Sequence, residues 1–270
     1  MNIFQGKVAL ITGASSGIGR ATALRLASFG ARLGLAARTT EKLQAVANEA
    51  AAKGGEAFAI PTDVTDREQC RRAVEATVER FGRLDILLCC AGVSMRGPFA
   101  DSDLDALERV MRVNFFGTLY PAYCAIPHLK KTEGSLAAIT SLSGKRGTPF
   151  YAIYGASKFA VQGLFASLRL ELAPAGVHVG VVAPGFVDTP LRENVLGPDG
   201  RPYETPPPPP FRVWPVEKCV DRIIELLVKR KAELLLPWFV RPFLALDEAV
   251  GGWLGDRYLA RKFGCRKKQE

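Results

Sequence analysis

The sequence lacks any run of about 18 uninterrupted apolar residues, the length that a membrane-spanning helix needs. It has only two histidines, His128 and His178, and no His or Cys cluster with the spacing of metal ligands. The adjacent Cys89 and Cys90 suit a buried strand end better than a disulfide. Nucleic-acid motifs and interleaved aromatic and basic residues are also missing. We therefore expect no metal, no nucleic-acid partner and a reduced, cytoplasmic setting, which the lack of a basic and apolar leader before the first apolar run also favours.

What the chain does contain is a regular alternation of short apolar runs and amphipathic stretches up to residue 236. The runs typical of buried strands are Lys7–Thr12, Arg32–Ala37, Glu56–Ile60, Leu84–Cys89, Ser135–Thr140, Val177–Ala183 and Glu233–Leu236. Helical patterns lie between them, near residues 18–29, 40–53, 66–81, 103–129, 154–173 and 216–231. This alternation predicts a Rossmann-like, doubly wound α/β fold, in which a mostly parallel, seven-stranded sheet has helices on both faces. No repeat or linker interrupts it, so we expect residues 1–270 to form a single domain.

Two segments fall outside this alternation. Residues 190–215 include TPPPPP at 205–210, which can be neither helix nor central strand and is expected to be extended. A long irregular loop after a parallel strand is where a substrate lid would lie. Residues 237–270 form a C-terminal extension, and Gly251-Gly252 would weaken or split a helix there. An apolar stripe recurs in it at helical spacing: Phe243, Leu246, Val250, Trp253 or Leu254, and Tyr258.

The net charge of +9 is concentrated toward the C-terminus, where ten Lys or Arg from Lys229 onward stand against five Asp or Glu. Five of the eight residues from Arg261 to Lys268 are basic. A solvated basic surface, with the apolar stripe packed on the domain or on a partner subunit, explains the extension. Peripheral contact with an anionic membrane, with the stripe closing an apolar substrate pocket, explains it as well. The sequence leaves both interpretations open.

A glycine-rich turn joins the first expected strand to the first expected helix. It contains Gly13, Gly17 and Gly19 in the spacing G-x3-G-x-G rather than the commoner G-x-G-x-x-G. The first glycine permits a tight turn, the second lets the backbone approach a pyrophosphate, and the third lets the helix pack on the strand. Because the helix N-terminus offers free N–H groups and a positive dipole end, the motif indicates a dinucleotide site.

A second motif, Tyr154-x-x-x-Lys158, places two side chains on one face of a helix, one turn apart. With both motifs present, the chain resembles the short-chain dehydrogenase/reductase family. Further matches lie where that family expects them: Asp63-Val64, Ala91-Gly92, Asn114 in VNFFGT, Ser141 in ITSLSG, and Pro184-Gly185. The matching motifs extend from residue 12 to residue 189. One departure is Cys89-Cys90, where the family usually has two asparagines that brace the sheet.

The resemblance implies a nicotinamide-dependent oxidoreductase acting on a carbonyl or an alcohol, with Asn114, Ser141, Tyr154 and Lys158 as the catalytic tetrad. Tyr154 would exchange a proton with the substrate oxygen, and Ser141 would hydrogen-bond that oxygen. Lys158 would hold the ribose hydroxyls, and Asn114 would position a water that supplies Lys158 with protons. The cofactor-binding residues that we expect are Gly13, Ser15, Ser16, Gly17, Ile18, Gly19, Arg38, Thr39, Asp63, Val64, Ala91, Gly92, Asn114, Tyr154, Lys158, Pro184, Gly185, Val187 and Thr189. The expected substrate-binding residues are Ser141, Ser143, Tyr151 and Tyr154.

Elementary electrostatics support this role for Tyr154. A free tyrosine has a pKa of about 10, so its ionisation near pH 7 costs about 4 kcal/mol. A lysine ammonium group about 4 Å away supplies about that much at an effective dielectric constant near 20. We therefore expect Lys158 to lower the pKa of Tyr154.

Two neighbours compete with these assignments. Tyr151 lies ten residues after Ser141, whereas Tyr154 lies thirteen after it, the separation that the family shows. We expect Tyr151 to line the substrate pocket or to pack at the start of the helix. Ser141 is preferred to Ser143 because it ends the strand and has Gly144 three residues later.

The end of the second expected strand bears on the choice of cofactor. Family members that prefer the unphosphorylated cofactor carry an acid there, which binds both ribose hydroxyls. Here the position is Ala37, followed by Arg38 and Thr39. Arg38 can bind a 2′-phosphate through paired, charge-assisted hydrogen bonds, although a solvent-facing arginine is the plainer interpretation. We expect NADP(H) to be preferred over NAD(H).

Together these features predict an NADP(H)-dependent oxidoreductase with a lipophilic substrate such as a steroid, a retinoid or a long-chain lipid. The resemblance also implies a homodimer or homotetramer that pairs helices near residues 103–129 and 154–173. The alternative is a dinucleotide-binding regulatory protein with weak or no catalysis. Because Tyr154 and Lys158 are both retained, the sequence favours the enzyme.

Overall fold

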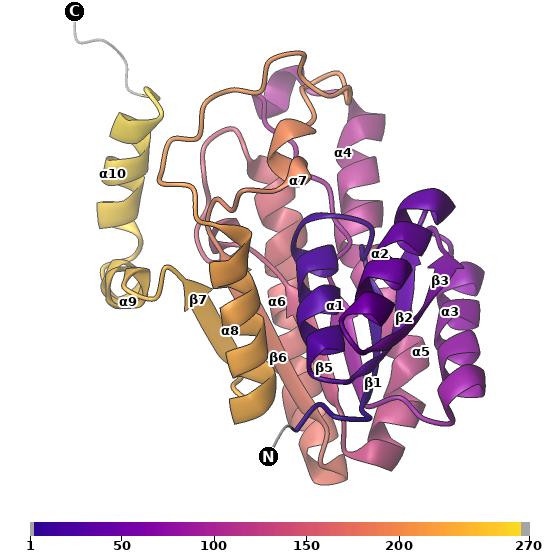
Figure 1. Ribbon diagram of the computed structural model, residues 1–270. Coiled ribbons are helices and arrows are strands. Elements are labelled where there is room, and N and C mark those ends of the chain that lie inside the picture. Colours follow the sequence, from indigo (N-terminus) through magenta and orange to yellow (C-terminus); the bar gives the residue numbers. More distant parts are fainter. Residues whose placement is uncertain (1–2, 266–270) are drawn as a thin grey trace, which may run out of the picture.

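Seven parallel strands form one sheet in the order β3-β2-β1-β4-β5-β6-β7 (Figure 1). The computed structural model describes residues 3–265. The strands are β1 (Val8–Thr12), β2 (Arg32–Ala37), β3 (Glu56–Pro61), β4 (Ile86–Cys89), β5 (Ser135–Ile139), β6 (His178–Pro184) and β7 (Glu233–Leu236). Each begins and ends within two residues of its expected position. The order reverses between β1 and β4, which leaves a crevice at the carboxyl ends of these two strands.

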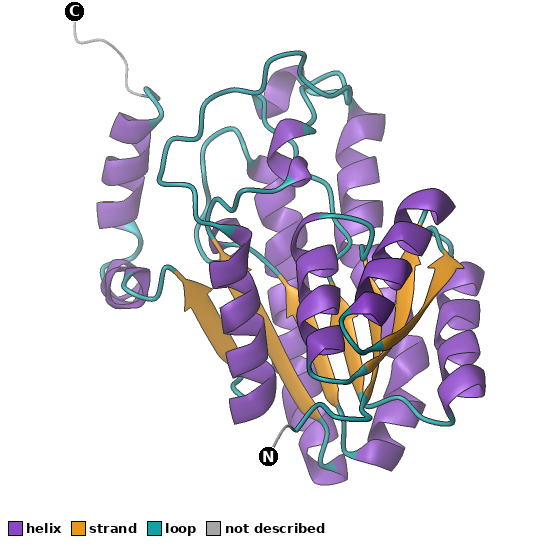
Figure 2. Ribbon diagram, in the orientation of Figure 1, coloured by secondary structure: helices purple, strands orange, loops and turns teal. Residues whose placement is uncertain are grey.

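Helices cover both faces of the sheet (Figure 2). One face carries α1 (Gly17–Ser28), α2 (Thr40–Ala52) and α8 (Val216–Lys229), and the other carries α3 (Arg67–Phe81), α5 (Gly117–Thr132) and α6 (Ala152–Leu172). Side chains of β1 alternate between the two cores, because successive strand residues point to opposite faces. The doubly wound parallel fold expected from the sequence is confirmed.

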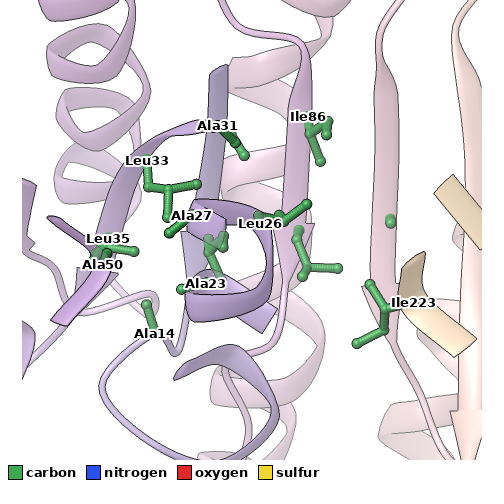
Figure 3. Close-up of a cluster of buried hydrophobic side chains, with 14 of the residues drawn as sticks. Ala14, Ala23, Leu26, Ala27, Ala31, Leu33, Leu35, Ala50, Ile86 and Ile223 are labelled. Atoms are coloured by element: carbon green, nitrogen blue, oxygen red, sulfur yellow. The ribbon is translucent and has the colours of Figure 1, made fainter. Parts of the chain in front are cut away.

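The core under α1 is built from small and branched aliphatic residues (Figure 3). Ala23, Leu26 and Ala27 of α1 pack on Leu33 and Leu35 of β2. Alanines on the helix let its backbone approach the sheet closely. The short turn between Thr12 and Gly17 places the N-terminus of α1 at the carboxyl end of β1.

The single helix expected near 103–129 is interrupted. Helix α4 (Leu104–Met111) passes into a π-helical segment at Arg112–Phe116, and α5 follows. A π turn holds one more residue than an α turn and occurs often at functional sites. Here it contains Asn114, whose side chain is fully buried and bonds to another segment. Short 3-10 segments lie at Phe99–Asp101 (η1), Leu142–Gly144 (η3) and Ala173–Ala175 (η4).

The two segments outside the alternation behave largely as expected. Residues 190–215 contain only the short helix α7 (Pro190–Glu193), and residues 206–209 have no regular structure. The extension forms α9 (Val240–Ala249) and α10 (Trp253–Lys262), separated at Gly251-Gly252, and both lie beyond the β7 edge of the sheet (Figure 1). Residues 266–268 of the basic run lie outside the described residues. Within residues 3–265, no helix has the length and apolar character needed to cross a bilayer.

Candidate active site

A large cavity of about 1260 Å³ lies at the carboxyl ends of the strands. Its walls come from the β1–α1 turn, the ends of β2 to β6, residues 190–215, and both helices of the extension. Every residue expected to bind cofactor or substrate lines this cavity, with the exception of Asn114. The fold therefore gathers motifs that are spread over residues 13–189 into one site.

The glycine-rich turn is compact. Gly13 has a φ of +66°, and a Cβ atom there would lie 2.7 Å from the backbone nitrogen of Ala91. A Cβ atom on Gly19 would lie 2.3 Å from the Gly13 carbonyl oxygen, so α1 can start here only with glycine at that position. The N-cap residue Ser16 makes no capping side-chain bond, which leaves the first N–H groups of α1 available to a ligand in the cavity.

Asn114 connects the loop after β4 to α6. Its Oδ1 accepts a 2.8 Å hydrogen bond from the Val93 N–H, and its Nδ2 donates to the Val93 carbonyl and to Ser157 Oγ. The Ser157 hydroxyl in turn donates a 2.7 Å bond to the Tyr154 carbonyl. Ser157 is not predicted from the sequence, where its position next to Lys158 is the only signal.

Ser141 and Tyr154 contact each other inside the cavity. Ser141 lies two residues after β5 as the N-cap of η3, where its Oγ accepts a hydrogen bond from the Ser143 N–H. Burial raises the pKa of Tyr154 to about 12, and a hydrogen bond with the Ser141 side chain lowers it in part. The pKa of Tyr154 is therefore raised, whereas the sequence predicted that Lys158 would lower it. The prediction was wrong because burial disfavours the phenolate more than the neighbouring groups stabilise it.

Lys158 is one helical turn after Tyr154, as the motif predicts. Its ammonium group donates a 3.1 Å hydrogen bond to the Ile139 carbonyl and lies 5.8 Å from the centre of the Tyr154 ring. Burial lowers the pKa of Lys158 to about 8, an effect that the buried thiols of Cys90 and Cys89 oppose. The lysine therefore titrates close to neutral pH.

Tyr151 stands at the N-cap of α6, one residue before the helix begins. Its ring centre lies 6.2 Å from that of Tyr154 and 6.4 Å from that of Phe186, and the Arg96 guanidinium lies 5.9 Å from it. Ser143 Oγ is 3.4 Å from Thr148 Oγ1. The geometry thus brings Ser141, rather than Ser143, to Tyr154, and it places Tyr151 on the cavity wall.

Basic side chains line the cavity next to the end of β2. Arg38 and Thr39 follow β2, and Lys42 in the first turn of α2 lines the same wall. Among the described residues that line the cavity, Asp63 is the only acid, and Arg38 forms no ion pair within residues 3–265. Lys42 was missed in the sequence because a lysine in a helical first turn has no distinctive pattern.

Of the two cysteines that replace the family's asparagines, Cys89 is buried and Cys90 is partly buried, and both thiols are neutral. Cys89 packs in the core behind the sheet, and burial raises the pKa of both thiols. Thr12 provides bracing here, since its Oγ1 accepts hydrogen bonds from the backbone nitrogens of Cys90 and Ala91. No group of residues within 3–265 could hold a metal ion.

Comparison with known proteins decides the family. The model described as short chain dehydrogenase matches residues 7–198. The chain belongs to this family. Members of this family are oxidoreductases with a nucleotide-binding fold.

Individual relatives agree with this assignment. The chain is 43% identical to 11-beta-hydroxysteroid dehydrogenase-like 3 of Arabidopsis thaliana over 68% of its own length and 60% of the plant protein's. It is 39% identical to an uncharacterized oxidoreductase of Listeria monocytogenes, over 71% of its own length and 78% of the bacterial protein's. Among solved structures, an alcohol dehydrogenase from Thermococcus sibiricus complexed with 5-hydroxy-NADP superposes with a TM-score of 0.73 at 27% identity, covering 85% of this chain and 95% of that one. The plant match thus spans less than two thirds of that protein.

Proposed function

We propose that this short-chain dehydrogenase is NADP(H)-dependent and interconverts a carbonyl and an alcohol on a lipophilic substrate, with Tyr154 as general acid and base. The observation that carries the proposal is that the Ser141 and Tyr154 side chains line the same cavity, with the side-chain nitrogen of Lys158 5.8 Å from the centre of the Tyr154 ring. A substrate oxygen next to this pair meets both a proton donor and a second hydrogen-bond partner.

The cavity fits a dinucleotide. Its volume is large, the uncapped N-terminus of α1 suits the pyrophosphate, and the main chain turns tightly at Gly13. Arg38 and Lys42 supply the positive charge that a 2′-phosphate needs, and Ala37 stands where an acid would repel it. The solved relative with 5-hydroxy-NADP supports the choice of the phosphorylated form.

The residues of the site divide the proton chemistry between them. Tyr154 carries its proton at neutral pH, because its pKa is about 12, and is suited to donate it to a carbonyl oxygen. Lys158, with a pKa of about 8, replaces that proton in reduction and takes one up in oxidation. When bound, the nicotinamide supplies or accepts the hydride.

Asn114 holds the loop after β4 against α6, which keeps Tyr154 and Lys158 in place. Its amide already bonds to Val93 and Ser157. A water that supplies Lys158 with protons would therefore bind the main-chain carbonyl oxygen of Asn114, which also accepts a hydrogen bond from Thr118 Oγ1.

Aromatic side chains support a lipophilic substrate. Tyr151, Phe186, Phe211, Phe243 and Tyr258 line the cavity on the side of residues 190–215 and the extension. Such a wall favours a flat or extended apolar body with one carbonyl or hydroxyl group. The name of the plant relative refers to a hydroxysteroid, which is consistent with this class.

Exposed apolar side chains support two kinds of partner. On α5 and α6, Tyr123, Phe159 and Leu170 are exposed, and these helices are the ones that the family pairs across a two-fold axis. On the extension, exposed apolar residues accompany basic ones, which supports peripheral contact with an anionic membrane. The described cysteines are all free thiols, consistent with a cytoplasmic location.

The test is a screen of carbonyl compounds with NADPH and NADH, followed by the absorbance of the reduced nicotinamide. We expect oxidation of NADPH with bulky apolar ketones and little with small aldehydes. Tight cofactor binding without turnover on any substrate would instead favour the regulatory alternative.

A further inference from the structure

Arg146 joins the segment that follows Ser141 to the C-terminal extension. It lies two residues after η3 and lines the cavity. Its Nε is 2.9 Å from Asp247 Oδ2 of α9, and one terminal nitrogen donates 2.6 Å hydrogen bonds to the Gly252 carbonyl and to Asp256 Oδ1. One side chain therefore binds α9, α10 and the turn between them.

The partner carboxylate depends on this contact. Asp247 is only 2% exposed, and its other oxygen accepts a 2.6 Å hydrogen bond from the Gly255 N–H. A buried carboxylate without a cation is strongly destabilising. Removing the Arg146 charge should therefore displace α9 from its present position.

Gly255 provides the space in which the guanidinium sits. A Cβ atom at this position would lie 2.5 Å from Asp247 Oδ2 and 2.6 Å from Arg146 Nε. Any other residue at 255 would thus force the pair apart. The packing of α9 against α10 and the contact between Arg146 and Asp247 therefore both depend on glycine at position 255.

The extension held in this way brings an aromatic ring to Tyr151, the neighbour of Tyr154. The ring centre of Phe263, just after α10, lies 6.5 Å from that of Tyr151 and 6.2 Å from that of Phe211. Tyr258 of α10 lies 6.2 Å from Phe211. Since Tyr151 is in ring contact with Tyr154, Phe263 is two ring contacts from the candidate proton donor.

Few other interactions fix the outer part of the extension. Leu246, Val250 and Trp253 are exposed, so the apolar stripe expected from the sequence is only partly packed. Phe243 and Tyr258 are the members of that stripe that line the cavity. The ion pair with Arg146 and the aromatic contacts are therefore the main attachments of α9 and α10 to the cavity.

We propose that Arg146 is a positioning residue for substrate specificity: by binding Asp247 and the α9–α10 turn, it holds Phe243 and Tyr258, which line the cavity, as the outer wall of the substrate pocket. The wall lengthens the apolar surface beyond Tyr151, so a large apolar carbonyl compound gains contact that a small one does not. This inference rests on the proposed function. Arg146 acts through the extension and does not touch the reacting atoms.

The experiment compares Arg146→Met, Asp247→Asn and Gly255→Ala with the parent. Each should raise KM for a bulky apolar ketone about tenfold, with kcat and the KM for a small aldehyde little changed, since only the outer wall moves. Arg146→Lys keeps the positive charge, so it should raise the KM for the bulky ketone less than Arg146→Met does. Lys145→Met is the matched control, because the neighbouring Lys145 pairs with Glu233 of β7 and not with the extension. If Arg146→Met does not fold, Gly255→Ala tests the same contact, because it keeps both charged side chains.

Hydrogen exchange of the backbone amides in residues 240–262 gives a readout that needs no activity. We expect faster exchange there in Arg146→Met and parent-like exchange in Lys145→Met. An unchanged ratio of the two KM values in the variants, or an equal change in Lys145→Met, overturns the inference. If the parent turns over no carbonyl compound, the proposed function fails instead, and unchanged exchange in Arg146→Met then overturns the positioning role on its own.

Discussion

The side-chain nitrogen of Lys158 lies 5.8 Å from the centre of the Tyr154 ring. The two groups share one buried environment, and burial acts on them in opposite senses. It raises the pKa of the tyrosine to about 12 and lowers that of the lysine to about 8, because in each case it disfavours the charged form. Of the two, the lysine is therefore the group that titrates near neutral pH.

The pH dependence should follow Lys158. Below its pKa of about 8 the lysine is protonated and can resupply Tyr154, so carbonyl reduction should fall as the pH rises through this value. Alcohol oxidation should rise over the same range, since it needs a proton acceptor. The measurement is kcat/KM in both directions from about pH 6 to about pH 10. Lys158→Arg stays charged throughout this range, so its pH profile should lack the transition. A transition that persists in Lys158→Arg would mean that another group titrates.

Catalysis should require the Tyr154 hydroxyl. Tyr154→Phe should lower kcat by about a hundredfold to ten-thousandfold, because it removes the proton donor and leaves the ring. The dissociation constant of the cofactor, measured by fluorescence titration, should stay close to that of the parent. Tyr151→Phe is the control and should change kcat far less. Parent-like turnover by Tyr154→Phe would refute the assignment.

Cofactor choice should depend on Arg38. Arg38→Ala should weaken NADPH binding by about tenfold to a hundredfold, the loss expected for a charge-assisted hydrogen bond, while NADH binding stays the same. Lys42→Ala should have a smaller effect in the same direction. Isothermal titration with both cofactors measures these differences. Equal affinity of the parent for NADPH and NADH would contradict the prediction.

Stability should depend on Asp85 before β4, which is 3% exposed. Burial raises the pKa of this carboxyl, but hydrogen bonds from Arg83, the Val8 N–H and Lys7 outweigh it, and the net shift is downward. A lowered pKa stabilises the fold above the unfolded value near 4, and this contribution is lost as the pH falls through the folded value. Asp85→Asn should therefore lower the free energy of unfolding by about 2 kcal/mol at pH 7. In urea titrations the difference from the parent should shrink toward pH 3; a constant difference would argue against the charge as its cause.

Membrane contact should use the exposed aromatic residues of the extension. We expect the full chain to co-sediment with vesicles containing anionic phosphatidylserine at low salt, and less at high salt. Replacing Trp238 and Trp253 by serine should reduce binding about tenfold, because interfacial tryptophans are lost. Phe99→Ser, which removes an exposed ring on η1, is the control. If the parent does not sediment with the vesicles at low salt, membrane contact is contradicted. The apolar stripe then packs on the domain or on a partner subunit instead.

The sequence by itself determined the sheet and the glycine turn, and it predicted the residues of the tetrad. Apolar runs and helical patterns are local, and the fold follows from their alternation because parallel strands require crossover helices. Since the carboxyl ends of such strands meet at one edge, Gly13, Ser141 and Tyr154 could be assigned to one site before any coordinates.

The tertiary structure decided the features that depend on distant segments. Asn114 bonds to Val93 and Ser157 and does not itself line the cavity, because a π turn and a hydrogen-bonded loop orient it. The pKa of Tyr154 moves upward because burial is a property of the folded surroundings and not of the motif. Arg146 meets the Gly252 carbonyl across 106 residues of sequence, and no local pattern records that contact. Periodicity sets which elements form, whereas the packing between them sets the environment of each side chain.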